Sequence, residues 1–126
     1  MDFIPTIVGK RVSVNLRRRF KYFHHCHIDG VVINKQKIHV QKPLDRVIKV
    51  TPKEFLPLPV VEHDRNWDIG KIVLVKQCID SYWTWWEAKI IGRVNDRAWK
   101  IKWIGQYDGY DDVVEVPADY ISDLIS

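Results

Sequence analysis

Apolar and polar residues alternate over short stretches of the chain, and no stretch of ten or more residues has the spacing of an amphipathic helix. Residues 8–16 alternate in this way, with Val12, Val14 and Leu16 on one face, which is typical of a half-buried strand. Further strands are expected over 22–28, 37–41 and 46–50. Asp29-Gly30 has the composition of a turn, and residues 31–33 either continue the preceding strand or start the next.

The second half of the chain repeats this order. Strands are expected over 69–76, 85–91, 98–104, 112–116 and 121–124. Pro52 and Pro117 stand at the same place in the two halves, each inside a short helical turn, and Thr51 with Glu54 has the spacing of a capping box. Strands of this length between frequent turns predict an all-β chain. We expect two small antiparallel barrels of about five strands each, at residues 8–58 and 67–125, joined by a short ordered linker over 57–67.

Composition narrows the class of protein. No apolar run approaches the roughly 20 residues needed to span a bilayer, so no membrane partner is expected, and residues 1–5 do not resemble a secretory signal. Cys26 and Cys78 lie far apart, which favours two reduced thiols in a cytosolic or nuclear protein.

Charge divides the chain into two unlike halves. Residues 8–58 carry twelve basic and three acidic side chains, a net charge of +9, whereas residues 59–126 carry eight basic and twelve acidic ones, a net charge of −4. Opposite charges on the two barrels indicate a different partner for each.

Aromatic residues gather in the second half, where residues 82–91 include four large rings and residues 99–110 include four more, interleaved with acids. A methylated ammonium keeps its charge but loses hydrogen-bond donors, so aromatic faces beside a carboxylate suit it better than a salt bridge does. The pattern therefore indicates a site for such a cation.

A set of residues in this half resembles a known group of modules. They are Gly70, Val73, Val75, Trp85, Trp86, Glu87, Ala88, Lys89, Ile90, Trp103, Ile104, Gly105, Tyr110, Asp111, Asp112, Val113 and Val114. Together they resemble the Tudor, Agenet and chromo-barrel modules of the Royal family of SH3-like barrels. The tandem arrangement is most similar to the paired Agenet/Tudor domains of the fragile X mental retardation protein family. Residues 82–89 also resemble the PWWP signature, with Thr84 and Glu87 in place of its prolines. The first half resembles these modules by strand order alone.

The resemblance implies a non-enzymatic reader, without cofactor, of methylated lysine or arginine on a histone or other protein tail. It implies a nuclear protein, or alternatively a cytoplasmic ribonucleoprotein component, and a place in a larger chain or complex. The module pattern implies a cage at one end of the second barrel, built from Tyr82 or Trp83 in a loop, Trp86, Trp103, and Tyr107 or Tyr110, with Asp108, Asp111 or Asp112 as the acid.

Two alternatives to an open cage remain. Strand alternation puts Trp86, Ala88 and Ile90 on one face and Trp85 on the other, so one of the two adjacent indoles belongs to a core. The rings can pack against the first barrel or a partner, or they can form a purely structural cluster. Trp99 is expected in the core and Trp67 between the barrels.

The basic half carries a second candidate surface. Its residues are Arg17, Arg18, Arg19, Lys21, Tyr22, Lys35 and Lys37, and they combine phosphate-binding cations with an aromatic ring. RNA or DNA is the expected partner, with weak sequence specificity because no helix reads a groove. An alternative function for the whole chain is therefore nucleic-acid binding with aromatics that are core or stack on bases.

Catalysis and metal binding have little support in the sequence. No nucleophile motif, phosphate-binding glycine loop or paired-cysteine motif is present. In the run from His24 to His27, only residues two apart share a strand face, so at most two ligands meet there and no metal site is predicted.

Overall fold

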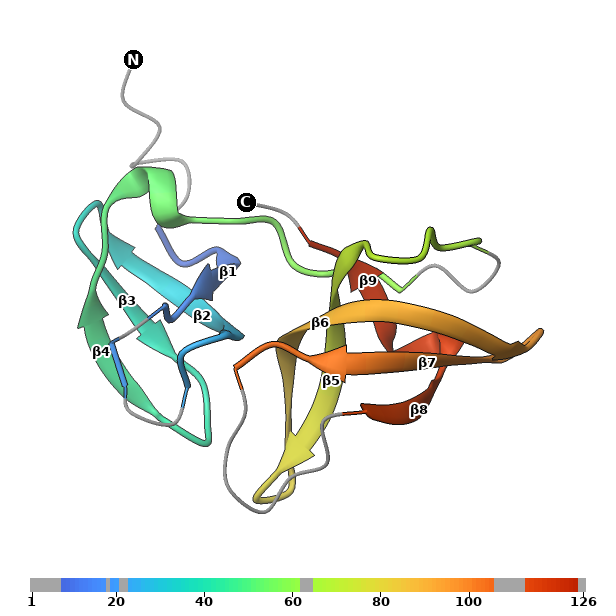
Figure 1. The fold of residues 1–126 in the computed structure, drawn as a ribbon. Coiled ribbons are helices and arrows are strands. Elements are labelled where there is room, and N and C mark those ends of the chain that lie inside the picture. Colours follow the sequence, from blue (N-terminus) through green and yellow to red (C-terminus); the bar gives the residue numbers. More distant parts are fainter. Residues whose placement is uncertain (1–7, 18, 21–22, 62–64, 106–112, 125–126) are drawn as a thin grey trace.

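Nine strands and two single turns of 3-10 helix make up the described part of the chain, which in this computed structural model comprises residues 8–17, 19–20, 23–61, 65–105 and 113–124 (Figure 1). The elements are β1 (Arg11–Asn15), β2 (Cys26–Asn34), β3 (Lys37–Val40), β4 (Arg46–Lys49), η1 (Pro52–Glu54), β5 (Ile72–Ile79), β6 (Tyr82–Asn95), β7 (Ala98–Trp103), β8 (Val113–Pro117), η2 (Ala118–Tyr120) and β9 (Ile121–Asp123). Among these residues no helix is long and apolar enough to cross a membrane.

The strands form two small SH3-like antiparallel barrels in tandem, as the sequence predicts. β1 to β4 surround one hydrophobic core and β5 to β9 surround another. The fifth strand of the first barrel is reduced to a single bridge, in which Leu56 pairs with Ser13 of β1. At the corresponding place in the second barrel, Ser122 of β9 pairs with Leu74 of β5.

The repeat extends to the backbone that enters each barrel. Gly9 and Gly70 both have a left-handed conformation, with φ of 84° and 92°. The Gly9 N–H donates to Val32 O at 2.8 Å, and the Gly70 N–H donates to Ile90 O at 2.7 Å. Glycine adopts positive φ without the steric cost that a Cβ imposes, which explains why both halves begin with it.

One turn prediction is wrong. Asp29 and Gly30 do not form a turn but lie inside β2, which continues unbroken to Asn34. A Cβ on Gly30 would lie 2.8 Å from the backbone oxygen of His39 on the neighbouring β3. Glycine is therefore needed here because another strand approaches closely, not because the chain reverses.

β6 is longer than predicted and joins the two barrels. It extends from Tyr82 to Asn95, and its middle pairs with the start of β2 through Cys26 with Trp86 and His27 with Trp85. β2 begins beside β6 and its arrow in Figure 1 points away from the second barrel, so that the two barrels share one continuous sheet. The central position of β6 brings side chains of the first barrel against the Trp-rich stretch.

Two tryptophans outside this junction belong to the second core. Trp99 is buried, as predicted. Trp67 was predicted to pack between the barrels, but it is buried within the second core cluster. Arg65 and Lys71 lie over its ring, and both also contact Asp123, so this indole closes one side of the second barrel.

Candidate functional site

Four of the predicted cage residues fall among the described residues: Tyr82, Trp83, Trp86 and Trp103. The other five, Tyr107, Asp108, Tyr110, Asp111 and Asp112, lie outside them. The four described rings do not surround one space. They divide between an exposed hairpin and the buried junction of the barrels.

Trp86 is the predicted cage residue that must be reassigned. Its side chain is 6% exposed and packs in the core of the first barrel, where its ring stacks on Phe23 with centroids 5.7 Å apart. The indole N–H donates to the hydroxyl of Thr84 at 2.8 Å. A ring that is buried and hydrogen-bonded in this way cannot form a wall of an open cage. Of the two adjacent indoles, Trp86 is the core residue and Trp85 is half-buried on the other face.

Tyr82 and Trp83 were predicted in a loop near Trp103, and the strand register corrects both points. Both residues belong to β6, where Trp83 pairs with Cys78 of β5. Trp103 pairs with Ala88, which lies five residues farther along β6. At about 3.3 Å per strand residue, the two pairs are separated by about 16 Å along the strand. Trp83 and Trp103 therefore do not face one another across a single site.

Trp83 has a different aromatic neighbour, Tyr120 of η2. The two rings meet edge to face, with centroids 5.5 Å apart and planes inclined by 77°. The ammonium of Lys76 on β5 lies over both rings, 5.3 Å from the centroid of Trp83 and 5.0 Å from that of Tyr120. We call Trp83, Tyr120 and Lys76 the hairpin site.

Sequence reasoning missed two of these three residues. Tyr120 was assigned to a structural turn, because nothing in a linear pattern shows that η2 packs beside β5. Pairing of Ile121 with Val75 places η2 there and brings Tyr120 next to Lys76. The repeat gave no signal either, since alignment of Pro52 with Pro117 places Tyr120 opposite Phe55, another aromatic residue.

Tyr82 is engaged by the first barrel. The ammonium of Lys42, from the segment between β3 and β4, lies 5.6 Å from the centroid of the Tyr82 ring. Both side chains are exposed, 39% in the case of Tyr82. Each of the two exposed aromatic rings at the start of β6 therefore has a lysine ammonium of this chain over its face, Lys42 over Tyr82 and Lys76 over Trp83.

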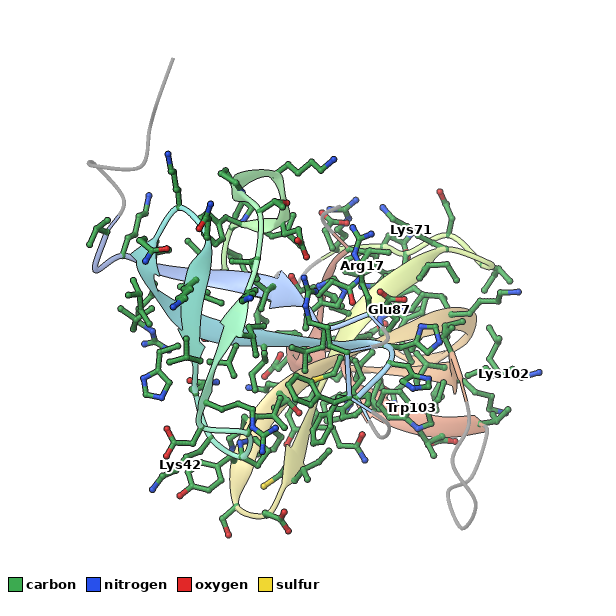
Figure 2. All side chains as sticks on the ribbon, turned by 90° about the vertical axis from the view of Figure 1, so that its left-hand side faces the viewer. Arg17, Lys42, Lys71, Glu87, Lys102 and Trp103 are labelled. Carbon is green, nitrogen blue, oxygen red and sulfur yellow. The ribbon has the colours of Figure 1, made fainter. Side chains whose placement is uncertain are left out.

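Trp103 belongs to the junction between the barrels. It is half-buried and packs against both hydrophobic cores. Two residues later the chain passes directly over the ring of His25, because a Cβ on Gly105 would lie 2.3 Å from its Cδ2. Gly105 also has φ of 69°, so this position requires glycine twice over. Trp103 and Glu87 are both labelled in Figure 2, and each contacts residues of the first barrel.

Glu87 forms the polar centre of this junction. Its two carboxylate oxygens contact His25 Nδ1 at 3.2 Å and His27 Nε2 at 2.9 Å, and Asn15 Nδ2 donates to the carboxylate at 3.3 Å. All three partners come from the first barrel, whereas Glu87 belongs to β6. Hydrogen bonds to a largely buried carboxylate fix the two barrels in register.

The protonation state of Glu87 follows from the same contacts. Burial alone raises the pKa of this carboxyl, but the hydrogen bonds from His27 and His25 outweigh burial and leave the pKa below its ordinary value. Glu87 is therefore an anion at neutral pH. The strand predicted over 22–28 begins only at Cys26, so His25 lies in the turn before β2 and His27 lies in β2. Both imidazoles nevertheless contact the same carboxylate. Among the described residues, no group of three side chains is arranged to hold a metal ion.

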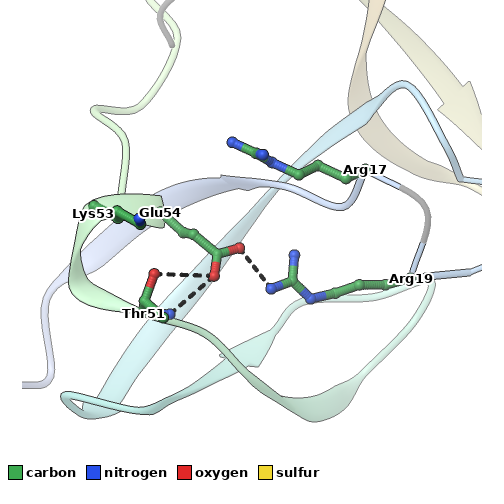
Figure 3. A pocket seen from close by; sticks show the side chains of 5 residues that line it. All are labelled: Arg17, Arg19, Thr51, Lys53 and Glu54. Carbon is green, nitrogen blue, oxygen red and sulfur yellow. Dashed lines mark hydrogen bonds and ion pairs between the residues drawn. The ribbon is translucent and has the colours of Figure 1, made fainter.

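The predicted nucleic-acid-binding residues of the first barrel also lie at two different places. Arg17 and Arg19 line an open cavity of about 730 Å³ together with Thr51, Lys53 and Glu54 of the η1 segment (Figure 3). We call this the η1 cavity. Lys35 and Lys37 lie instead at the turn between β2 and β3 and at the start of β3. Arg18, Lys21 and Tyr22, the remaining predicted residues, lie outside the described part of the chain.

A smaller cavity of about 80 Å³ connects this region with the junction. It is lined by Asn15, Arg17, His27, Lys53, Glu54, Leu56, Glu87 and Leu124. Three of these residues, Arg17, Lys53 and Glu54, also line the η1 cavity. The basic surface of the first barrel and the His–Glu–His cluster are therefore adjacent.

Comparison with known proteins identifies the fold. No protein-family model matches the sequence, and no curated protein matches it either. Among solved structures, the chain is similar to Arabidopsis thaliana AGDP1 AGD34, an Agenet-domain protein, with a TM-score of 0.63 and 14% sequence identity. The match covers 95% of this chain and 84% of that chain. The chain therefore has an Agenet/Tudor-type fold.

Proposed function

We propose that this chain is a non-enzymatic binding module that recognises a methylated lysine or arginine in a protein tail at the hairpin site. The observation that carries this proposal is the position of the Lys76 ammonium over the faces of both Trp83 and Tyr120. The site already attracts an alkylammonium ion. A methylated side chain suits it better than lysine does, because each added methyl reduces hydration and contacts the ring faces.

The geometry favours recognition of the cation from solvent. Trp83 is 48% exposed, Tyr120 and Lys76 are half-buried, and the edge-to-face contact holds the two rings at a wide angle. Displacing the Lys76 ammonium into water costs little, since an exposed cation–π contact is worth only about 0.5–1 kcal/mol. A tail that brings its own methylated ammonium can therefore take the place of Lys76.

The predicted acids of the second barrel remain part of this proposal. Asp108, Asp111 and Asp112 are predicted from the sequence to supply the negative charge that a dimethylammonium or methylguanidinium N–H requires, and Tyr107 and Tyr110 to supply further rings, but all five lie outside the described residues. The fold supports a binding role, since Agenet/Tudor-type folds are typically non-enzymatic binding modules. Cys26 is no nucleophile, because it is packed in the first core and burial raises the pKa of its thiol far above the ordinary value.

Titration of methylated peptides tests the proposal. Peptides that carry unmodified, mono-, di- or trimethylated lysine, or methylated arginine, are titrated into the chain while tryptophan fluorescence or backbone amide shifts are recorded. We expect binding that rises with methylation, with dissociation constants between about 1 µM and 1 mM, as a few cation–π contacts permit after the cost of association.

Two pairs of variants assign binding to the hairpin site. Tyr120→Phe keeps the ring and should retain binding, whereas Tyr120→Leu should weaken it about three- to tenfold. Trp83→Phe and Trp83→Leu give the same comparison at the other ring. If methylation has no effect on any peptide, the reader function is wrong. If methylation matters but the leucine variants bind normally, the reader function stands and the hairpin site is the wrong place for it.

A further inference from the structure

The η1 cavity carries a second inference, which does not depend on the methyl-lysine proposal. Its lining has three cations, Arg17, Arg19 and Lys53, and one carboxylate, Glu54. In Figure 3 the Arg17 and Arg19 side chains extend from the same segment toward η1, where Lys53 and Glu54 lie. Some of these charges are neutralised inside the protein, and the others remain available to a ligand.

Glu54 is fully engaged by the protein. Its carboxylate accepts hydrogen bonds from the Thr51 N–H at 3.0 Å and the Thr51 hydroxyl at 3.2 Å, and it contacts Arg19 Nη2 at 2.5 Å. Burial raises the pKa of this carboxyl, but the hydrogen bonds from Arg19 and Thr51 outweigh burial and lower the pKa overall. The one acidic side chain that lines the cavity therefore forms an ion pair with Arg19.

Arg17 and Lys53 are the two cations of the η1 cavity that Glu54 does not neutralise. Neither side chain has an acidic partner among the described residues, and both are exposed. Arg17 has φ of 53°, an uncommon conformation for a residue with a side chain, and its N–H donates to Asn15 Oδ1 at 2.9 Å. This turn directs the chain so that Arg17 lies at the cavity. Two cations therefore line an open space, beside a third that is held by Glu54.

A second pair of cations adjoins the cavity. Lys37 of β3 and Lys49 of β4 stand directly opposite one another in the antiparallel register, and both are exposed. Like charges directly opposite one another destabilise a sheet, so neither ammonium is neutralised by the other, and both are available to an anion that reaches them from the cavity. Arg19, which lines the cavity, donates from Nη2 to the backbone oxygen of Lys49 at 3.3 Å as well as contacting Glu54, so the Lys49 backbone lies beside the cavity.

We propose that the η1 cavity and the adjoining Lys37–Lys49 pair bind successive phosphates of a nucleic-acid strand, without reading its bases. A strand with a charge at every nucleotide fits two adjoining cationic places, whereas a single phosphorylated side chain needs only one. Base stacking has no described partner here. Phe20 lies under Arg46 at 5.4 Å, and Phe23 stacks on Trp86. Affinity therefore comes from phosphate contacts, with little sequence preference.

Fluorescence anisotropy tests this proposal on the whole chain. The probes are labelled oligouridine, oligothymidine and duplex DNA, titrated from about 50 to about 200 mM salt. Arg17→Gln/Lys53→Gln removes the two available cations of the cavity and leaves the Arg19–Glu54 pair intact. We expect binding to single strands about tenfold weaker at low salt, and a slope of log affinity against log salt that is smaller by about 1.4, which corresponds to two lost contacts. Lys37→Gln/Lys49→Gln should have a similar effect.

A matched variant controls for overall charge. Lys89 and Lys102 are also exposed and directly opposite one another, but they lie on β6 and β7 of the second barrel. Lys89→Gln/Lys102→Gln lowers the net charge by the same amount and should leave both affinity and salt slope nearly unchanged. An equal loss in this control, or no loss in the two first-barrel variants, overturns the proposal. So does tighter binding of a phosphoserine peptide than of either single strand, which would identify a phosphopeptide site.

Discussion

The indole of Trp86 stacks on the ring of Phe23 across the two barrels, with planes inclined by 29°. Phe23 belongs to the first half of the chain, and Trp86 belongs to the strand at the centre of the second. One tryptophan of the second barrel thus completes the core of the first. The first barrel therefore lacks part of its interior without the second, whereas the second core is built from residues of the second half alone.

Replacing Trp86 should therefore destabilise the first barrel, whose core its ring completes. Trp86→Ala removes a buried ring and leaves the Thr84 hydroxyl without its donor, so the free energy of unfolding should fall by about 3–5 kcal/mol. Trp83→Ala, three residues earlier and 48% exposed, should cost about 1 kcal/mol or less. Urea unfolding monitored by circular dichroism measures both. Equal losses in the two variants would contradict the assignment of Trp86 to the core.

Alternation along β6 predicted which side chains point inward, because a period of two is a property of any strand. Strand alternation did not predict which of the two barrel cores each side chain enters. Trp86 and Ala88 share one face, yet Trp86 enters the first core and Ala88 the second. The change occurs where β2 pairs with β6, a contact between residues about sixty positions apart that no local pattern encodes.

The role of Glu87 also depends on a contact between distant parts of the chain that no local pattern encodes. On sequence it was one of several side chains on the outer face of a strand, and its role depends on His25 and His27 being brought opposite it. The two histidines did carry a signal, since residues two apart share a face. That signal only limited a shared ion to two ligands, which led to the prediction of no metal site, and it did not point to a carboxylate partner. The repeat, the barrels and the capping pair of Thr51 with Glu54 were predictable, because they depend on short-range chemistry.

The Glu87 cluster predicts how acid affects the junction. The folded-state pKa of Glu87 is lowered, so its ionised form stabilises the folded chain above the unfolded pKa of about 4.3. That contribution is lost as the pH falls through the lower folded-state value. The stability difference between the wild type and Glu87→Gln should therefore be large at pH 6 to 7 and shrink toward pH 3.

Unfolding in urea at a series of pH values measures this difference. The pKa of Glu54 is also lowered, so the wild type loses stability in acid from two sites. Glu54→Gln should remove the second contribution and leave the Glu87 effect in place. A stability difference between the wild type and Glu87→Gln that stays constant from pH 7 to pH 3 would show that the carboxylate does not bind the two histidines as an anion.

Gly105 should tolerate no side chain. Gly105→Ala places a Cβ 2.3 Å from the His25 ring and forces alanine to φ of 69°. Strain of this kind costs about 1–2 kcal/mol before the histidine moves, and moving His25 weakens its contact with Glu87. Gly92→Ala is the matched control, because nothing lies within 4 Å of its Cβ position. Thermal unfolding should show a clear loss for the first variant and a change within about 0.5 kcal/mol for the second.

Lys76 should act as an internal competitor of the proposed ligand. Its ammonium occupies the faces of Trp83 and Tyr120, so a methylated side chain must first displace it. Lys76→Ala removes that competitor while keeping both rings, and affinity for a trimethyl-lysine peptide should rise about three- to tenfold, the equivalent of one or two exposed cation–π contacts. Lys89→Ala, an exposed lysine elsewhere on the second barrel, controls for the loss of one positive charge. Isothermal titration calorimetry of the same peptide with the wild type, Lys76→Ala and Lys89→Ala measures the change in affinity. Weaker binding by Lys76→Ala would make the lysine part of the binding surface, and unchanged binding would place the methylated side chain away from Trp83 and Tyr120.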